Sequence, residues 1–287
     1  MSKNTAKTKK TICNVLVHIF LTLLALIWIF PILWVIMLSF RAGTGSYTTT
    51  FIPEQFTINN YVRLFMETDL FNFPRWFMNT LIVACCSCVI STFFVLSVSY
   101  CMSRLRFKLR KTFMNVALIL GMFPGFMSMI AVYYILKGMG MAEGPLKMVA
   151  LILVYSAASG LGFYVVKGFF DTIPKAIDES AYLDGASKFQ VFTKITIPLS
   201  KPVIVQTIIQ AFLAPWLDFI FAKVIVGTEP KYFTVAIGLW TMLTKENITN
   251  WYTRFACGAV CVSIPIAFLF CMMQKYYTEG SSGAVKG

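Results

Sequence analysis

The chain has 287 residues and a formal net charge of +13; 58% of the residues are hydrophobic and only 13% are charged. Charged residues make up about a quarter of a water-soluble globule, so this composition excludes that class. The apolar residues form long uncharged runs, and in lipid such runs satisfy their backbone groups as helices. We therefore predict an all-α membrane protein, whose positive charge serves topology and contact with anionic lipid rather than nucleic-acid binding.

Six apolar runs are each long enough to cross a hydrocarbon core of about 30 Å. In chain order they cover 14–38, 77–102, 113–136, 148–170, 203–226 and 252–274. The first run follows four lysines, as in a signal peptide, but it is long and lacks a small-residue cleavage site, so we interpret it as a retained span. The expected organisation is an N-terminal segment at 1–13, a six-span domain at 14–274 and a tail at 275–287.

Lysine and arginine predict the orientation. If both termini are cytoplasmic, most of the 25 basic residues fall on the inner side, including the five between Arg104 and Lys111. The outer segment 41–76 then contains an amphipathic helix from Thr57, with Ile58, Tyr61, Val62, Leu64 and Phe65 on its apolar side. Two interpretations of this segment stay open: a connector that packs on the ends of the spans, and a docking surface.

Within the runs, few residues suggest chemistry. The eight cysteines lie in or beside apolar runs and the single histidine, His18, lies in the first run, so we predict no metal site and no catalytic group. Pro124 interrupts the third run and predicts a kink. Asp218 is one of the few charges near the bilayer, where a charge is costly and is a candidate for function. We expect Asp218, Trp216 and Pro124 to lie along a solute pathway, with a structural role at the membrane edge as the alternative for Asp218.

The polar insert between the fourth and fifth runs, at 171–202, predicts two short helices. Pro174 is expected as the first residue of a helix that ends near Leu183, and Gly185 breaks the chain. Ser187 and Gln190 form a capping box for a second helix, which is expected to end before Pro198.

The two predicted helices differ in character. Small residues make a shallow face on the first helix, while Asp178 and Glu179 are expected to face water. On the second helix Phe189, Phe192 and Ile195 recur at helical spacing and predict an apolar ridge. The insert is therefore shaped to enter a groove of a cytoplasmic partner, the alternative being a loop that lies on the bilayer.

The spacing within this insert resembles the Glu-Ala-Ala loop of bacterial ABC-importer permeases. Glu179-Ser180-Ala181 is followed after three residues by Gly185, and after nine more by Ile195-Thr196-Ile197-Pro198. Ser180 and Ile197 depart from the family pattern. Further along, "PWLDF" is similar to a stretch that carbohydrate permeases carry after the loop, with Leu217 in place of Asn, and the Gly-rich ending resembles the smaller permease of maltose-type importers (MalG type). The resemblance covers nearly the whole chain.

The resemblance implies an ABC type I importer permease fold and a set of contact residues. The ATPase-coupling loop would use Glu179, Ser180, Ala181, Asp184, Gly185, Phe189, Ile195 and Pro198. The tail residues Ala284, Lys286 and Gly287 would reach the ATPase subunits, although Ser281 and Ser282 depart from the family's tail.

The same resemblance implies the partners and the task. This chain would form half of the path for a sugar, such as maltose or a maltodextrin, in a bacterial cytoplasmic membrane. Its partners would be a second related permease, two ATPase subunits that bind ATP and Mg²⁺, and an extracytoplasmic sugar-binding protein. The chain itself lacks a phosphate-binding loop and is expected to hold no cofactor. The alternatives are an ABC permease for an amino acid or polyamine, and a membrane channel or enzyme.

Overall fold

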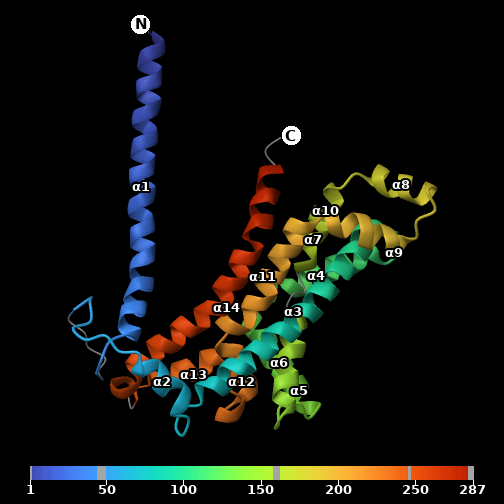
Figure 1. The fold of residues 1–287 in the computed structure, drawn as a ribbon. Helices are drawn as coiled ribbons and strands as arrows, with labels where there is room; N and C mark the ends of the chain where they lie inside the picture. Colours follow the sequence, from blue (N-terminus) through green and yellow to red (C-terminus); the bar gives the residue numbers. More distant parts are fainter. Residues whose placement is uncertain (1, 44–49, 158–161, 245–246, 284–287) are drawn as a thin grey trace. The chain divides into compact units, whose positions relative to one another are not determined.

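A computed structural model of the chain describes residues 2–43, 50–157, 162–244 and 247–283 (Figure 1). Within these residues the regular structure is helical, apart from one isolated β-bridge between Arg41 and Phe56. The prediction of an all-α protein is therefore confirmed. The chain divides into two compact units, Met1–Leu70 with Thr241–Cys261, and Phe71–Trp240 with Val262–Gly287. The last helix, α14 (Ile248–Gly283), runs through both.

The first unit contains α1 (Ser2–Ser39) and the short helix α2 (Asn59–Met66), the amphipathic helix that the sequence predicts in the outer segment. The side chain of Asn60 donates to Ser39 O and Arg41 O, at 3.1 and 2.8 Å, so α2 is fixed to the end of α1. Of the residues expected on its apolar side, Ile58, Val62 and Phe65 are exposed, as a side that lies along a membrane surface would be in the chain alone, and Leu64 is buried.

Glu67, directly after α2, binds two arginines. It accepts from Arg63 Nε and from Arg254 Nη1 of α14, each at 2.6 Å. The hydrogen bond from Arg63, aided by the charge of Arg254, holds the pKa of the Glu67 carboxyl below its usual value. The start of α2 is thus bound to the end of α1, and its end is bound to α14. These contacts favour the interpretation of the outer segment as a connector that packs on the ends of the spans.

The second unit is built around α3 (Phe73–Arg104), which packs against α6 (Leu146–Ala157), α7 (Gly162–Thr172) and α11 (Lys201–Leu217). The side chain of Asn72 caps α3 by accepting from Arg75 N at 3.0 Å. Buried residues of α3, α7 and α11 form one core cluster: Val95, Leu96, Tyr100, Phe163, Val166, Phe170 and Val203. This cluster lies near the C-terminal end of α3, where α3 packs on α7 and α11, the two helices that the polar insert connects.

The start of α3 is held by the segment after α12 (Ile220–Val226), namely the 3-10 turn η3 (Pro230–Tyr232) and α13 (Val235–Met242). Trp76 Nε1 donates to Pro230 O at 3.0 Å, and Thr80 Oγ1 accepts from Val235 N at 2.8 Å. Polar groups inside an apolar core need partners, and these two bonds supply them.

In the part of the chain that the structure describes, four helices are long and apolar enough to cross a membrane, and the number rises to six if each of two sharply bent helix pairs is one span. The four are Thr11–Ser39, Phe73–Arg104, Leu146–Thr172 and Ile248–Tyr276. Residues 158–161 of the third fall outside the described residues. Which segments cross the membrane, and in which direction, therefore stays a prediction.

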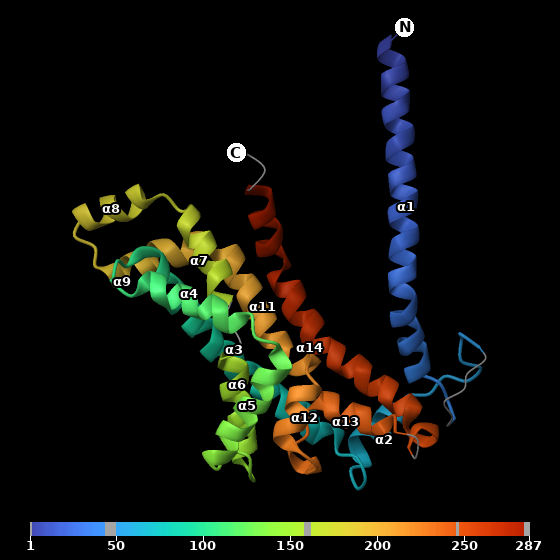
Figure 2. The ribbon, with the colours of Figure 1, turned by 180° about the vertical axis from the view of Figure 1, so that it is seen from behind.

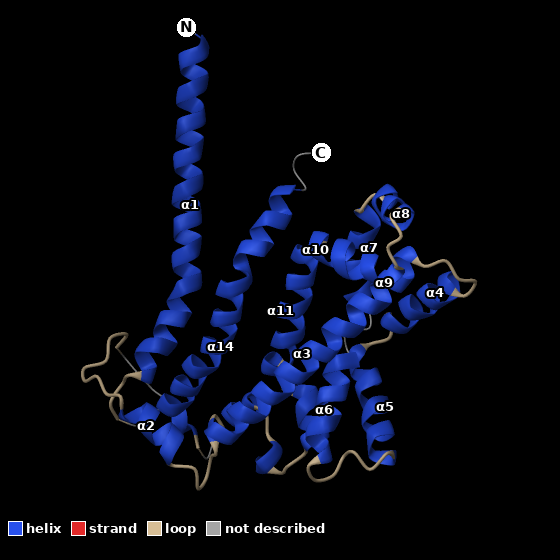
Figure 3. Cartoon of the chain, turned by 45° about the vertical axis from the view of Figure 1, so that its right-hand side comes forward, coloured by secondary structure: helices blue, strands red, loops and turns tan. Residues whose placement is uncertain are grey.

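Two predicted runs are not single helices. The run at 113–136 divides at Pro124 into α4 (Arg110–Gly121) and α5 (Gly125–Gly138), which meet at 102° (Figure 3). A proline lacks the N–H that would continue the helix, and here the result is a sharp break rather than a kink. In the run at 203–226 the first helix ends at Leu217, and a new helix, α12, begins at Ile220.

Candidate functional site

The polar insert forms a compact loop at the end of α3, α7 and α11 (Figures 1 and 2). It contains α8 (Lys175–Leu183), α9 (Lys188–Val191), a π-helical turn η2 (Phe192–Thr196) and α10 (Ile197–Leu199). The first predicted helix is confirmed. It begins one residue later than expected, because Pro174 is its N-cap and Lys175 its first helical residue.

The turn between α8 and α9 follows the sequence signals closely. Gly185 has a φ of +83°, which side chains with a Cβ rarely adopt, and a Cβ built there would meet no atom within 4 Å. Backbone conformation, rather than crowding within this chain, therefore requires the glycine. The capping box is also confirmed: Ser187 Oγ accepts from Gln190 N at 3.2 Å, and Gln190 Oε1 accepts from Ser187 N at 2.7 Å.

The outer side of the loop presents apolar and acidic groups to the surroundings. Leu183 and Phe189 are 89% and 72% exposed, and Glu179 and Asp184 are also exposed. Ala181 is half-buried beside them. Large apolar side chains at the tip of a polar loop are typical of a surface that another protein covers.

Asp178 is a correction to the sequence prediction, because it is buried and does not face water. Its Oδ2 lies 3.1 Å from Nε of Arg104, the last residue of α3. The two side chains are 7% and 4% exposed. Sequence reasoning assigned Arg104 to a cytoplasmic charge cluster. The sequence signal was the position of Asp178 within the first turn of the predicted helix.

The second helix of the loop is a further correction, because it does not end before Pro198. The π-helical turn η2 widens the backbone ahead of this proline, and Ile197 N donates to Phe192 O, five residues earlier. Helical structure then continues through Leu199. The predicted ridge is also divided: Phe192 packs on Tyr100 with ring centroids 4.7 Å apart, while Phe189 points outward.

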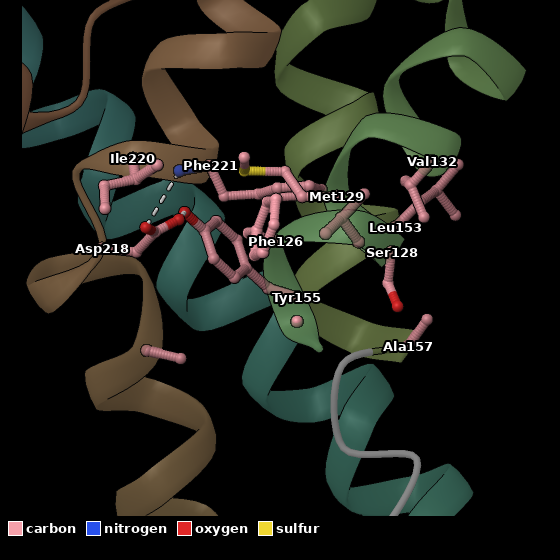
Figure 4. Close-up of a pocket in the computed structure, with 13 residues that line it drawn as sticks. Phe126, Ser128, Met129, Val132, Leu153, Tyr155, Ala157, Asp218, Ile220 and Phe221 are labelled. Carbon is pink, nitrogen blue, oxygen red and sulfur yellow. Dashed lines mark hydrogen bonds between the residues drawn. The ribbon is translucent and has the colours of Figure 1, made fainter. Parts of the chain in front are cut away.

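Asp218 lies where α11 ends and α12 begins, beside a pocket of about 730 Å³ that it lines (Figure 4). Its carboxylate accepts from Phe221 N at 3.1 Å, Ala222 N at 3.2 Å and the Tyr155 hydroxyl at 2.6 Å. Asp218 therefore satisfies two free N–H groups in the first turn of α12, which supports a structural role for it. The pocket wall is otherwise mostly apolar and comes from α5, α6 and the α11–α12 break.

Trp216 and Pro124, the other two residues expected along a solute pathway, do not themselves line this pocket. Trp216 is buried, with Phe77 and Phe212 packed against it at 5.3 and 5.9 Å between ring centroids. Pro124 is exposed and directly precedes Gly125, which does line the pocket. A pathway through these residues stays a prediction.

The tail residues Ala284, Lys286 and Gly287 lie outside the described residues. Among the residues that the structure describes, no group of three or more His, Cys, Asp or Glu side chains is arranged to hold a metal ion.

Comparison with solved structures identifies the class of fold. The chain matches a crystal structure of a bacterial ABC transporter involved in the import of the acidic polysaccharide alginate, with a TM-score of 0.79 over 94% of this chain and 98% of that one. The sequences are 19% identical, so the likeness shows the fold alone. The fold is that of an ABC importer permease.

The sequence comparisons then define the family. A model of the family described as "Binding-protein-dependent transport system inner membrane component" matches residues 94–277, and the chain belongs to this family. It is 33% identical to the galactooligosaccharides transport system permease protein GanQ of Bacillus subtilis, over 98% of both chains. It is 31% identical to the maltodextrin transport system permease protein MdxG of the same organism, over the full length of both. It also resembles the MalG proteins of maltose transport systems.

Proposed function

We propose that this chain is one of two permease subunits of an ABC importer for an oligosaccharide, a maltodextrin or a related sugar, in a bacterial cytoplasmic membrane. ATP and Mg²⁺ would be bound by two partner ATPase subunits, and an extracytoplasmic binding protein would deliver the sugar. The proposal is supported by the family and by the names of full-length relatives that transport maltodextrin and galactooligosaccharides.

The exposed loop built by α8 and α9 is the observation that carries the mechanism. Its tip presents Leu183, Phe189 and Glu179 outward, while its base is fixed to α3. An exposed apolar protrusion of this kind, fixed to α3, would fit a groove of an ATPase subunit. Glu179 is placed to pair with a basic group in that groove. Closure of the ATPase subunits on ATP would then displace the loop, and the spans would change between inward-facing and outward-facing states.

The test is a comparison of two glycine variants in the complete transporter, purified with its permease, ATPase and binding-protein partners. Gly185→Arg places a large charged side chain, in an unfavourable backbone conformation, at the proposed contact. Gly140→Arg imposes the same side chain on a glycine with a similar φ, +72°, in the loop between α5 and α6. We expect Gly185→Arg to lose ATPase association or sugar-stimulated ATP hydrolysis, and Gly140→Arg to retain both.

The measurements are co-purification of the ATPase subunits and ATP hydrolysis in lipid, with maltodextrins, galactooligosaccharides, an amino acid or a polyamine. Normal association and stimulation in Gly185→Arg would contradict the coupling role of this loop. Stimulation by an amino acid or polyamine alone would keep the loop and overturn the sugar as the solute.

A further inference from the structure

The last turns of α3 carry three polar side chains that each bind a different segment of the loop. Residues spaced i, i+3 and i+4 lie on one face of a helix, so all three point the same way. The contacts are Tyr100 Oη to Lys188 O at 3.1 Å, Ser103 Oγ to Asp171 Oδ1 at 2.6 Å, and Arg104 Nε to Asp178 Oδ2 at 3.1 Å. The end of α3 is thereby joined to α7, α8 and α9 at once.

Arg104 makes the most constrained of these contacts. Besides the ion pair with Asp178, its Nη2 donates to Ile173 O at 3.0 Å. Ile173 directly precedes the N-cap of α8, and Asp178 lies in the first turn of α8. The guanidinium of Arg104 therefore contacts the start of α8 at two points, through the ion pair with Asp178 and the hydrogen bond to Ile173 O. Movement of α8 away from either contact pulls on α3.

A contribution to the stability of the fold does not by itself explain the buried ion pair of Arg104 and Asp178. Both side chains are nearly buried, and Arg104 Nε, Arg104 Nη1 and Asp178 Oδ1 have no hydrogen-bond partner among the residues that the structure describes, so Arg104 and Asp178 meet as an ion pair without a hydrogen bond. Removing two charges from water is costly, and packed apolar residues often hold a structure equally well. What the pair adds is a direct electrostatic connection between the loop and α3, the helix that packs against α6, α7 and α11.

We propose that Arg104 and Asp178 are positioning residues that transmit displacement of α8 to α3, and through α3 to the helices around it. Neither residue touches the transported solute or the nucleotide. This inference rests on the proposed function, because it assumes that an ATPase subunit moves α8. It assigns the transmission to one buried ion pair rather than to the backbone of the loop.

The experiment compares Arg104→Gln, Asp178→Asn and the double variant in the assembled transporter in lipid. Basal ATP hydrolysis, hydrolysis stimulated by sugar-loaded binding protein, and sugar transported per ATP are measured for each. We expect the single variants to keep basal hydrolysis and to lose stimulation and transport per ATP by about tenfold, within the range seen for residues that carry coupling. The double variant, which leaves no unpaired buried charge and allows an amide pair, should recover part of the loss.

Two further variants make the result specific. Arg106→Gln removes an exposed positive charge two residues away and should behave as wild type. Arg104→Lys keeps the charge without the planar fork, so it should assemble yet transport less sugar per ATP.

Assembled variants of Arg104 or Asp178 with unchanged stimulation and transport per ATP would overturn the inference. So would loss of assembly in every variant of the pair, which would assign it to folding only. Failure of the proposed function would look different, because the wild type itself would then bind no ATPase subunit or respond to no sugar.

Discussion

At Gly238, α13 comes so close to α3 that no side chain fits between them. A Cβ built on Gly238 would lie 1.9 Å from Cε3 of Trp76. Trp76 is 1% exposed, and its ring is held by the bond from Nε1 to Pro230 O, so it has little freedom to move away. The absence of a side chain at this one residue therefore permits the packing of two elements that are far apart in sequence.

We predict that Gly238→Ala destabilises the protein by roughly 1–3 kcal/mol, the usual cost of overpacking a filled core. Thermal unfolding in detergent should show a lower melting temperature than wild type. Gly168→Ala is the matched control, because Gly168 is an exposed glycine of α7 with no atom within 4 Å of the added Cβ. Alanine is the better helix former, so this control should be neutral or stabilising by up to about 1 kcal/mol. Equal melting temperatures for Gly238→Ala and wild type would contradict the close contact.

At the scale of elements, α9 is the first turn of the helical stretch that continues through η2 and α10, and it begins at a cap. The first N–H groups of any helix lack partners inside the helix, so this turn depends on groups outside it. The reciprocal bonds between Ser187 and Gln190 satisfy two backbone donors at its start. The cap thus fixes how the chain leaves Gly185 and where Phe189 is presented.

We predict that Ser187→Ala weakens the start of α9 by about 1 kcal/mol, which corresponds to roughly fivefold faster amide exchange in 187–191. Hydrogen exchange measured by mass spectrometry resolves this segment. Ser180→Ala, in which the lost hydroxyl bonds only Ile177 O within α8, should leave exchange at 187–191 unchanged. Unaltered exchange in Ser187→Ala would show that packing, and not the cap, orders the turn.

The loop also shows which features sequence alone could predict. Pro174, Gly185 and the Ser187–Gln190 box act on their own neighbours, so the two helices and the turn were predictable from local rules. The burial of Asp178 was not, because its partner Arg104 lies far away in sequence and is brought close only by packing. The π-helical turn ahead of Pro198 likewise begins at Phe192, which packs on Tyr100, a residue far away in sequence.

In the apolar runs too, some features follow from the local sequence and others depend on the folded chain. Uncharged runs predicted where apolar helices occur, since hydrophobicity and length suffice for that. The sharpness of the break at Pro124 and the separate helix after Asp218 depend on which groups satisfy the free backbone ends. Those partners come from the folded arrangement, and run length contains no information about them.

At the scale of the whole chain, orientation in the membrane is the main open prediction. Reporter insertions after Lys108, Gly140, Asp184 and Gly227 would place one reporter in each of four successive loops. Positive-inside bias predicts that the reporters at Lys108 and Asp184 are cytoplasmic, and that those at Gly140 and Gly227 are outside. A fusion to the C-terminus should be cytoplasmic and serves as an internal reference. Finding Gly140 and Asp184 on the same side would show that Leu146–Thr172 does not cross.

The break at Pro124 has a consequence for which side of the chain can meet lipid. Where α4 ends and α5 begins, Met122 N and Phe123 N still donate to carbonyls of α4, and Met127 N and Ser128 N donate to Pro124 O. Not every backbone group at such a junction can be satisfied by its own helix. Hydrocarbon offers no donor or acceptor, so an interrupted span of this kind must turn its gap toward water or protein. If α4 and α5 are one span, the bend therefore fixes the rotation of that span in the plane of the bilayer, with the gap directed away from the acyl chains.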